Sequence, residues 1–299
     1  MPLRAIAAGI AAAAAVASCL PPAAASAASR PGALGVGSRD DFELVPFATH
    51  ATAAVTFVKT SAVVPSTGRS YTRYVSAVDP RYLTAELPAK TGCEELVHAT
   101  AIAQEHGCTV ATNGAFFDMH TGKLNHCIGN VASNGSQVQL PGGDGANFGI
   151  VRSKGSVLVG FASAKALRDE PVSDVLQGRG WLVRNGQDWV RKSPDLNTSS
   201  TFVTEKAPRT AVGVFPNGTA ALVVVDGAET IRAGLDLFEF AEVLAAQVGV
   251  QHAVNIDGGG SSVAVVNGKI ASKPTCVDTP SPICERAMPT IMCARGTLV

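Results

Sequence analysis

The sequence predicts a fold of the α+β or mixed α/β class, a hairpin-rich mixed sheet with a few packed helices, stapled by disulfides. Glycine-containing turns separate alternating apolar runs in NFGIVRSKGSVLVGF, WLVRNGQDWV and VAVVNGKIAS, which is typical of β-hairpins. The ranges 91–107 and 236–249 carry capping residues at their starts and a glycine at their ends, which predicts two helices. Six cysteines follow residue 30, an even number that suits disulfides in a secreted chain.

The N-terminus has the three parts of a secretory signal peptide. Arg4 supplies a positive charge, an alanine-rich apolar run follows, and residues 25–27 form a small-residue cleavage motif. An alanine-rich transit peptide is the alternative. We expect a signal peptide over 1–27, a flexible lead-in over 28–50 and a single domain over 51–299.

Composition excludes several classes of partner. The formal net charge is zero and the charged residues, 16% of the chain, are interspersed, so nothing favours nucleic acid or an anionic membrane. No later stretch is apolar and long enough to predict a membrane span. We expect a protein of the secretory pathway, secreted or in the lumen of the Golgi or endomembranes. Three sequons fit this compartment: Asn134, Asn197 and Asn217.

The segment 208–257 predicts a functional sheet edge. RTAVGVF and TAALVVVD form a hairpin that turns near Asn217, which places Arg209 opposite Val225 or Asp226. A helix and the strand HAVNID follow, and this order indicates a crossover between parallel strands. The ends of TAALVVVD and HAVNID then meet at one edge, so we expect Asp226, Asp257 and Arg209 to converge there.

The run VNIDGGGSS supplies the chemistry expected at this edge. Backbone N–H groups of a glycine-rich turn approach an anion closely because no Cβ intervenes. The predicted nest consists of Gly258, Gly259 and Gly260, with Ser261 or Ser262 adding a hydroxyl. Arg209 would grip a phosphate, and Asp257 would be an acid, base or nucleophile. An ordinary Asp-Gly turn or a bulge is the alternative.

Other polar residues are weaker candidates. Asn113, Asn130 and Thr210 are candidate substrate contacts, although Asn113 also fits an Asn-Gly turn and Asn130 a structural role. Phe116 and Phe117 point to opposite faces of a strand, so one fits the core and the other a sugar-stacking platform. No cysteine pair has zinc-finger spacing, and the histidines share no face with ligand spacing, so we expect no metal and no cofactor.

Several motifs together resemble a known family. In chain order they are TNGAFFD, HCIGNVASNG, PRTAVGV, VVDGAETIRAGLDLFEFAEVL and VNIDGGGSS. They resemble the phosphodiester glycosidase family from about residue 50 to 295. The resemblance implies removal of α-linked N-acetylglucosamine from a phosphodiester on a glycan or glycoprotein, which would leave mannose 6-phosphate. It also implies three disulfides: Cys93–Cys127, Cys108–Cys293 and Cys276–Cys284.

The implied chemistry fits the predicted edge. A phosphomonoester leaves readily, so the demand for a general acid is lower than in ordinary glycoside hydrolysis. Arg209 and the glycine turn would hold phosphate, Asp257 would serve the sugar carbon as base or nucleophile, and Asp226 would be a second carboxylate. The alternatives are a metal-assisted phosphodiesterase with Asp226 and Asp257 as cation ligands, a glycosidase acting on another sugar phosphodiester, and a non-catalytic carbohydrate-binding protein. A homo-oligomer stays open.

Overall fold

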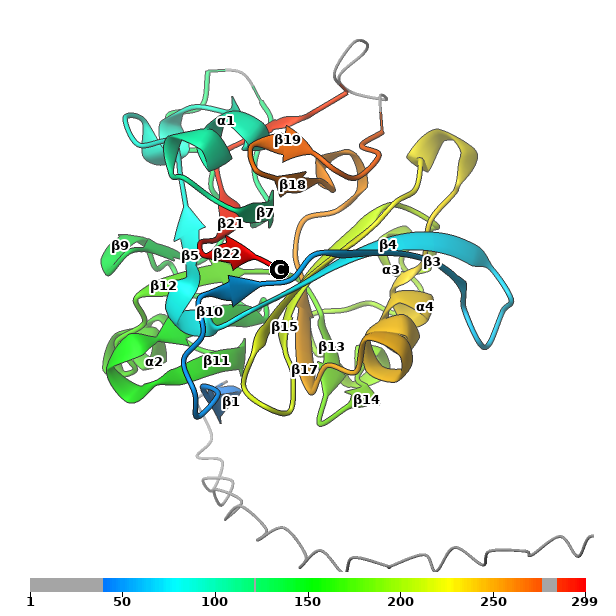
Figure 1. The fold of residues 1–299 in the computed structure, drawn as a ribbon, viewed down its shortest axis with the longest axis horizontal. Coiled ribbons are helices and arrows are strands. Elements are labelled where there is room, and N and C mark those ends of the chain that lie inside the picture. Colours follow the sequence, from blue (N-terminus) through cyan, green and yellow to red (C-terminus); the bar gives the residue numbers. More distant parts are fainter. Residues whose placement is uncertain (1–39, 121, 276–283) are drawn as a thin grey trace, which may run out of the picture. The chain divides into compact units, whose positions relative to one another are not determined.

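The computed structural model describes residues 40–120, 122–275 and 284–299. The described residues belong to one compact unit, and their strands form four sheets (Figure 1). Apart from the parallel β2–β22 pair, the strand pairs in these sheets are antiparallel, so the predicted mixed, hairpin-rich fold is confirmed. The predicted signal peptide and the lead-in up to residue 39 lie outside the described residues.

The nine-stranded sheet contains the predicted functional edge, and a second large sheet has six strands. In order across the nine-stranded sheet the strands are β14 (Gln187–Asp188), β13 (Trp181–Arg184), β17 (His252–Asn255), β15 (Arg209–Val214), β16 (Ala220–Val225), β4 (Ser70–Val78), β2 (Ala54–Val55) and β22 (Thr297–Leu298), with β3 (Val58–Val63) on β4. The six-stranded sheet consists of β1 (Asp41–Pro46), β11 (Ser156–Phe161), β10 (Asn147–Val151), β12 (Asp174–Gln177), β8 (Val131–Ser133) and β9 (Ser136–Gln139).

Two smaller sheets and four α-helices complete the described fold. The five-stranded sheet consists of β19 (Lys269–Ile270), β18 (Ala264–Val266), β7 (Val110–Asn113), β21 (Ile291–Ala294) and β5 (Leu83–Glu86), and β20 (Ala287–Met288) pairs with β6 (Val97–His98). The helices are α1 (Ala99–Glu105), α2 (Ala164–Asp169), α3 (Thr201–Thr204) and α4 (Leu237–Glu242). Single 3₁₀ turns lie at Pro80–Tyr82, Gly92–Glu94, Arg152–Lys154, Val190–Lys192, Glu229–Ile231 and Gly259–Ser261.

The predicted helix over 236–249 is confirmed together with its caps. Asp236 and Glu239 form a reciprocal capping box, and Gly249 ends the helix at φ 82°. After α4 the last turns, Val243–Val248, are π-helical, which the sequence pattern did not indicate. Leu237, Phe240 and Leu244 are buried in a core cluster with residues of the nine-stranded sheet.

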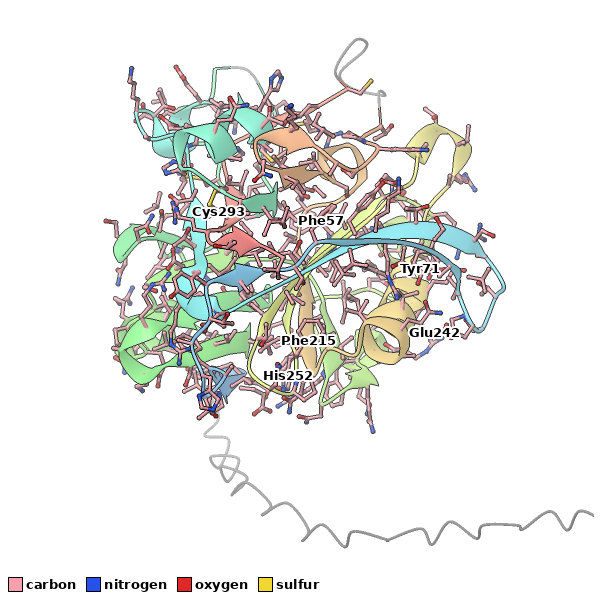
Figure 2. The ribbon with its side chains drawn as sticks, in the orientation of Figure 1. Phe57, Tyr71, Phe215, Glu242, His252 and Cys293 are labelled. Atoms are coloured by element: carbon pink, nitrogen blue, oxygen red, sulfur yellow. A yellow bond between two sulfur atoms is a disulfide. The ribbon has the colours of Figure 1, made fainter. Side chains whose placement is uncertain are left out.

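A long β-hairpin formed by β3 and β4 reaches α4 from the N-terminal half of the chain (Figure 1). Ser66, at its tip, donates its backbone N–H and its hydroxyl to Glu242, and the Tyr71 hydroxyl donates to Gln247. Figure 2 labels Tyr71 and Glu242 on the two sides of this contact. The hairpin therefore fixes one flank of the helix that crosses from β16 to β17.

Three local predictions are wrong. The predicted lead-in over 28–50 contains β1, which pairs with β11 although only one of its side chains, Val45, is buried; backbone pairing at a sheet edge forms it rather than a strong apolar pattern. The helix predicted over 91–107 begins only at Ala99, because Val97–His98 pair with β20 and Cys93 is bonded to Cys127. Thr91 makes no capping hydrogen bond.

The third correction concerns residues 191–207, where a polar sequence with a proline and a sequon predicts a surface loop. It contains the short helix α3, and the Val203 side chain of that helix is buried in the core. A four-residue helix is too short to show periodicity in the sequence.

Two of the three implied disulfides are present. Cys93 is bonded to Cys127, and Cys108 is bonded to Cys293, which joins the segment before β7 to β21 across 185 residues of sequence. Figure 2 labels Cys293. The third implied pair includes Cys276, which lies outside the described residues.

The three sequon asparagines differ in their contacts. Asn197 and Asn217 are exposed, and the side-chain oxygen of each accepts a bond from the residue two positions on. The amide nitrogen of Asn134, the atom that would carry a glycan, donates to both oxygens of buried Glu86, at 3.1 and 3.0 Å. Glycosylation therefore stays a prediction at all three positions, and at Asn134 it would compete with this contact.

Candidate active site

The predicted crossover is confirmed. β15 lies between β16 and β17 and is antiparallel to both, so β16 and β17 run in the same direction and end at the same edge. Arg209 pairs with Val225, as the turn at Asn217 predicts. On the other side Ala211 pairs with Asn255, and this register continues toward Asp257 opposite Arg209.

Asp257 lies two residues beyond the end of β17 and is only partly buried. Its backbone N–H donates to Gly114 O at 3.2 Å, and its Oδ1 accepts from the N–H of Gly258 at 2.9 Å. A Cβ on Gly258 would lie 3.1 Å from Pro208 O and 3.8 Å from Arg209 Cδ, so the glycine permits the turn to approach the start of β15. The candidate catalytic carboxylate is thus held on a close-packed turn at the sheet edge.

Asn113 and Thr210 form a buried network that holds the backbone of this turn. Asn113 is 1% exposed, and its Nδ2 donates to Asp257 O at 2.7 Å. Its Oδ1 accepts from Thr210 Oγ1 at 2.8 Å and from Val263 N at 3.2 Å. The structure therefore brings both predicted residues to the site, where their side-chain bonds are made to the protein itself.

Asp226 does not converge with Arg209, so that part of the prediction is wrong. Cross-strand partners share a face, so Arg209 lies on the face of Val225, and Asp226, next along the strand, points to the other face. There its carboxylate accepts from the Tyr74 hydroxyl and from Lys273 N, each at 2.9 Å. The pKa of Asp226 is raised above its ordinary value because burial of the carboxylate outweighs the opposing effect of these two hydrogen-bond donors. The prediction counted strand ends but not the alternation of faces.

The glycine turn has most of its amides engaged. The N–H groups of Gly258, Gly259, Ser261 and Ser262 donate respectively to Asp257 Oδ1, Pro208 O, Gly258 O and Gly259 O. This leaves the Gly260 amide as the candidate donor to a ligand. The hydroxyl of Ser261 accepts from Arg286 Nη1 at 3.0 Å. The turn is built mainly to fix its own shape.

Arg209 is 2% exposed, and its guanidinium braces the chain around the site. Its Nε donates to Leu235 O at 3.0 Å, and its Nη2 donates to Phe202 O and Glu205 O at 3.0 and 2.8 Å. It ties α3 and the segment before α4 to the start of β15. These bonds use donors that the sequence analysis assigned to a phosphate.

A cavity of about 520 Å³ lies beside this edge. Its lining consists of Phe116, Ile128, Asp144, Gly145, Gln177, Gly178, Arg179, Pro194 and Asp195. Two of its walls are anchored to the end of β17, because Arg179 N donates to Asn255 O at 2.9 Å and Asp257 N donates to the carbonyl of Gly114, two residues before Phe116. The cavity is therefore adjacent to the end of β17 and to the backbone of Asp257.

The two neighbouring phenylalanines divide as the strand alternation predicts. Phe117 packs against the buried cluster around α1, and Phe116 lines the cavity. The Phe116 ring meets the Phe202 ring edge-on, with centroids 5.9 Å apart. Arg179, which the sequence analysis missed, stacks over Phe202 with 4.6 Å between its Cζ and the ring centroid. A lone arginine in QGRGW gave no sequence signal.

Asn130 lies behind the cavity wall. It is fully buried, its Nδ2 donates to Asn147 Oδ1 at 2.9 Å, and its Oδ1 accepts from Gly142 N at 3.0 Å. Its backbone N–H donates to Oε1 of Gln177, which lines the cavity. Asn130 supports that wall through Gln177.

The described residues bear on ligands and membranes in two ways. They contain no group of three or more His, Cys, Asp or Glu arranged to hold a metal ion. No helix among them is long and apolar enough to cross a membrane.

Comparison with known proteins gives consistent matches. N-acetylglucosamine-1-phosphodiester alpha-N-acetylglucosaminidase of Bos taurus is 39% identical over 217 residues, which is 68% of this chain and 40% of that protein. The Mus musculus protein of the same name is 36% identical over 266 residues, 83% of this chain and 49% of that protein. The chain thus spans under half the length of these curated relatives.

Solved structures and a family profile complete the comparison. The zebrafish enzyme of that name, solved as a catalytic domain auto-inhibited by its pro-peptide, has a TM-score of 0.74 and 28% identity, and the match covers 86% of this chain and 88% of that chain. A hypothetical protein from Synechocystis shares the fold at a TM-score of 0.55 and 17% identity, over 80% of this chain and 62% of that chain. The phosphodiester glycosidase profile matches residues 106–295, and the chain belongs to the phosphodiester glycosidase family.

Proposed function

We propose that this protein hydrolyses the bond between C1 of α-linked N-acetylglucosamine and the phosphate of a phosphodiester. The observation that carries the proposal is the position of Asp257, a partly exposed carboxylate at the end of β17 beside a cavity that presents an aromatic ring and an exposed arginine. An aromatic face suits a sugar ring, and a guanidinium suits a phosphate. The names of the relatives supply the sugar and the linkage.

In the proposed reaction Asp257 acts at the anomeric carbon C1. It either attacks C1 as a nucleophile or acts as the base that activates a water molecule for that attack. The C1–O bond breaks, its electrons leave with the phosphate oxygen, and water supplies the new hydroxyl on the sugar. The products are N-acetylglucosamine and a phosphomonoester, which is a good leaving group near neutral pH. The protein therefore needs to stabilise charge at the phosphate and at the sugar carbon more than it needs a strong general acid.

We assign supporting roles to the buried polar residues around the turn. Asn113 and Thr210 hold the backbone of Asp257, and Asn130 supports the cavity wall through Gln177. Arg209 fixes α3 against the strand edge. A role for Asp226 and Asp257 as paired cation ligands is not supported, because the Asp226 carboxylate accepts from Tyr74 and Lys273 N on the face away from Arg209, whereas the β15–β17 register continues toward Asp257 opposite Arg209.

The proposed substrate is a glycoprotein that carries N-acetylglucosamine on mannose 6-phosphate, and the proposed compartment is the secretory pathway. The two disulfides support an oxidising compartment, since such bonds persist there and are rare in the cytosol. The shared name of the curated relatives supports the sugar and the bond.

The test is incubation with N-acetylglucosamine-α-phosphomannose followed by product analysis. Free N-acetylglucosamine plus mannose 6-phosphate is the expected result. The appearance of N-acetylglucosamine 1-phosphate plus mannose would show cleavage of a P–O bond and would overturn the proposal. An intact substrate together with measurable binding would favour a non-catalytic carbohydrate-binding protein.

A further inference from the structure

Two exposed arginines in this protein stack on phenylalanine rings at the walls of two different cavities. Arg179 lies over Phe202 with 4.6 Å between Cζ and the ring centroid, and Arg191 lies over Phe238 at 4.5 Å. We propose that Arg179 is the residue that binds the substrate phosphate, and that Phe202 and Asn255 position it. This inference rests on the proposed function and names a specificity-determining residue for it.

Arg179 is more available to a ligand than Arg209. Arg209 is 2% exposed and commits its Nε and Nη2 to three backbone carbonyls. Arg179 is exposed and lines the cavity, and its guanidinium has no carboxylate partner among the described residues. The Arg179 guanidinium is planar and stacks with one face on the Phe202 ring. The N–H groups on its edge can still donate a pair of hydrogen bonds to two phosphate oxygens.

The cavity around Arg179 has few acidic side chains in its lining. Of the two carboxylates that line its cavity, Asp195 is engaged, since it accepts from Gly180 N at 2.7 Å and from Ser193 Oγ at 2.6 Å. The other, Asp144, is exposed to solvent. A phosphate at Arg179 therefore meets one arginine and two carboxylates in the lining of this cavity.

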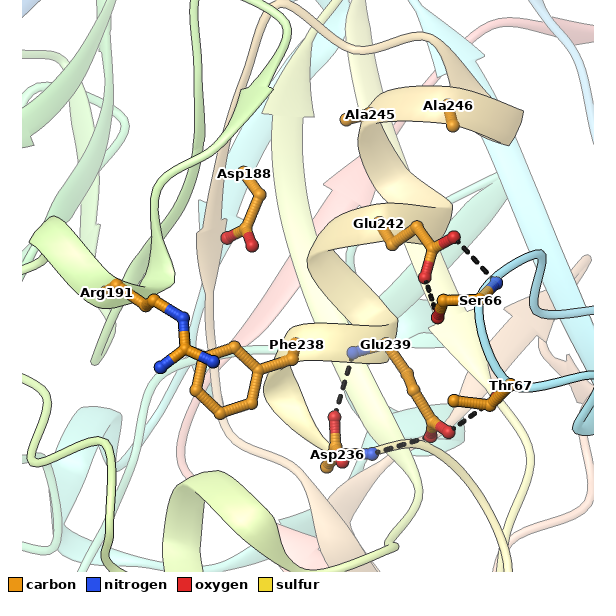
Figure 3. A pocket seen from close by; sticks show the side chains of 10 residues that line it. All are labelled: Ser66, Thr67, Asp188, Arg191, Asp236, Phe238, Glu239, Glu242, Ala245 and Ala246. Carbon is orange, nitrogen blue, oxygen red and sulfur yellow. Dashed lines mark hydrogen bonds between the residues drawn. The ribbon is translucent and has the colours of Figure 1, made fainter.

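Arg191 shows the opposite case. It lines a groove of about 460 Å³ between α4 and the tip of the β3–β4 hairpin, and Figure 3 shows it beside Phe238. Four carboxylates line the same groove: Asp188, Asp236, Glu239 and Glu242. Lys206 pairs with two of them, but the groove stays rich in acid and would repel a phosphate. The two sites share an arginine–phenylalanine stack and differ in their charge.

Asn255 holds the backbone of Arg179 and of the next residue, Gly180, through three hydrogen bonds. Arg179 N donates to Asn255 O at 2.9 Å, Asn255 Nδ2 donates to Arg179 O at 3.1 Å, and Asn255 N donates to Gly180 O at 2.9 Å. The Phe202 ring also contacts the Arg209 guanidinium, whose Cζ lies 5.6 Å from the ring centroid, and the Phe202 carbonyl accepts from Arg209 Nη2. Asn255 is the last residue of β17, and Asp257 lies two residues beyond it. The end of β17 therefore positions both Arg179 and the Asp257 carboxylate.

The reaction places a growing charge where this arginine would bind. A phosphodiester carries one negative charge, and the phosphomonoester that leaves gains a second as the C1–O bond breaks. Arg179 would bind the leaving phosphate more strongly in the transition state than the diester in the ground state, so it would raise kcat as well as affinity.

The test compares Arg179→Gln with Arg191→Gln, which removes a similarly stacked arginine from the acidic groove. With N-acetylglucosamine-α-phosphomannose as substrate, Arg179→Gln is expected to lower kcat/KM about 10- to 100-fold, the range for a lost charge-assisted hydrogen bond. Arg179→Lys, which keeps charge but loses the fork, should fall between. Arg191→Gln should match the wild type. Calorimetric titration with mannose 6-phosphate should show a similar loss of affinity for Arg179→Gln, and N-acetylglucosamine should inhibit all four proteins equally.

The outcomes separate this inference from the proposed function. A wild type that does not cleave the diester refutes the function, and the mannose 6-phosphate titration still decides the role of Arg179. If the wild type cleaves the diester and Arg179→Gln keeps its kcat/KM, the inference is wrong. If Arg179→Gln weakens inhibition by N-acetylglucosamine as much as it lowers kcat/KM for the diester, the change has distorted the whole site. That result would also overturn the inference. As a test of positioning, Asn255→Ser should raise KM for the diester and leave N-acetylglucosamine inhibition unchanged.

Discussion

Replacing Asn113 with alanine should destabilise the protein strongly, because one buried side chain closes three hydrogen bonds. The change leaves Asp257 O without its 2.7 Å donor and removes the acceptor of Thr210 Oγ1 and Val263 N. Each buried polar group left without a partner costs about 1–3 kcal/mol, and the groups share one network, so we expect a loss of about 3–5 kcal/mol. At about 2–4 °C for each kcal/mol in a domain of this size, Tm should fall by about 6–20 °C.

The assay is calorimetry together with urea unfolding, with hydrolysis measured well below the lowered Tm. Asn197→Ala is the matched control, since its side-chain oxygen bonds only Ser199 on the surface and its loss should cost under about 0.5 kcal/mol. Asn113→Asp keeps the two acceptor bonds but sets a carboxylate against Asp257 O. It should therefore retain more stability than Asn113→Ala yet lose activity.

A Tm for Asn113→Ala within about 2 °C of the wild type would correspond to less than about 1 kcal/mol and would refute this reasoning. It would mean that the three groups find other partners when Asn113 is absent. Normal activity in Asn113→Asp would show separately that the backbone position of Asp257 does not control the reaction.

Three further changes test the carboxylates, the core and the cross-links. Asp257→Asn should lower kcat by about 10²- to 10⁴-fold while Asp226→Asn stays near the wild type in kcat, measured by release of N-acetylglucosamine. Burial lowers the pKa of His252 from 6.5 to about 4, so the unfolded chain binds more protons than the folded chain between these pH values. The free energy of unfolding therefore falls as pH drops through that window. His252→Gln should abolish about 3 kcal/mol of this loss, measured by urea unfolding at pH 7 and pH 4. Replacing Cys108 and Cys293 together with serine should cost about 2–5 kcal/mol in urea unfolding.

Each of these predictions has a contradicting result. Full activity in Asp257→Asn, or a large loss in Asp226→Asn, would reverse the assignment of the carboxylates. An unchanged pH slope in His252→Gln would show that other groups set the acid sensitivity. Equal unfolding midpoints with and without the Cys108–Cys293 bond would show that the contacts between β7 and β21 suffice on their own.

The sequence alone determined the strand order of the functional edge. Counting back from the turn near Asn217 set Arg209 opposite Val225 or Asp226, and the structure shows Val225. A helix of the right length between two strands required the crossover that brings Asp257 to the same edge. These features depend on local turn chemistry and on chain connectivity, which are written in consecutive residues. The capping box at Asp236 and the division of Phe116 from Phe117 follow from local patterns in the same way.

Only the tertiary structure decided which side chains are available to a ligand. Arg209 and Asn113 carry the right chemistry in the sequence, but their polar atoms are engaged by carbonyls and a hydroxyl from segments far along the chain. Arg179 shows no motif, yet packing against Phe202 places it in the wall of the cavity. The physical reason is that a buried polar group must find its partners wherever the fold brings them, and pairing between distant segments is not encoded in local spacing.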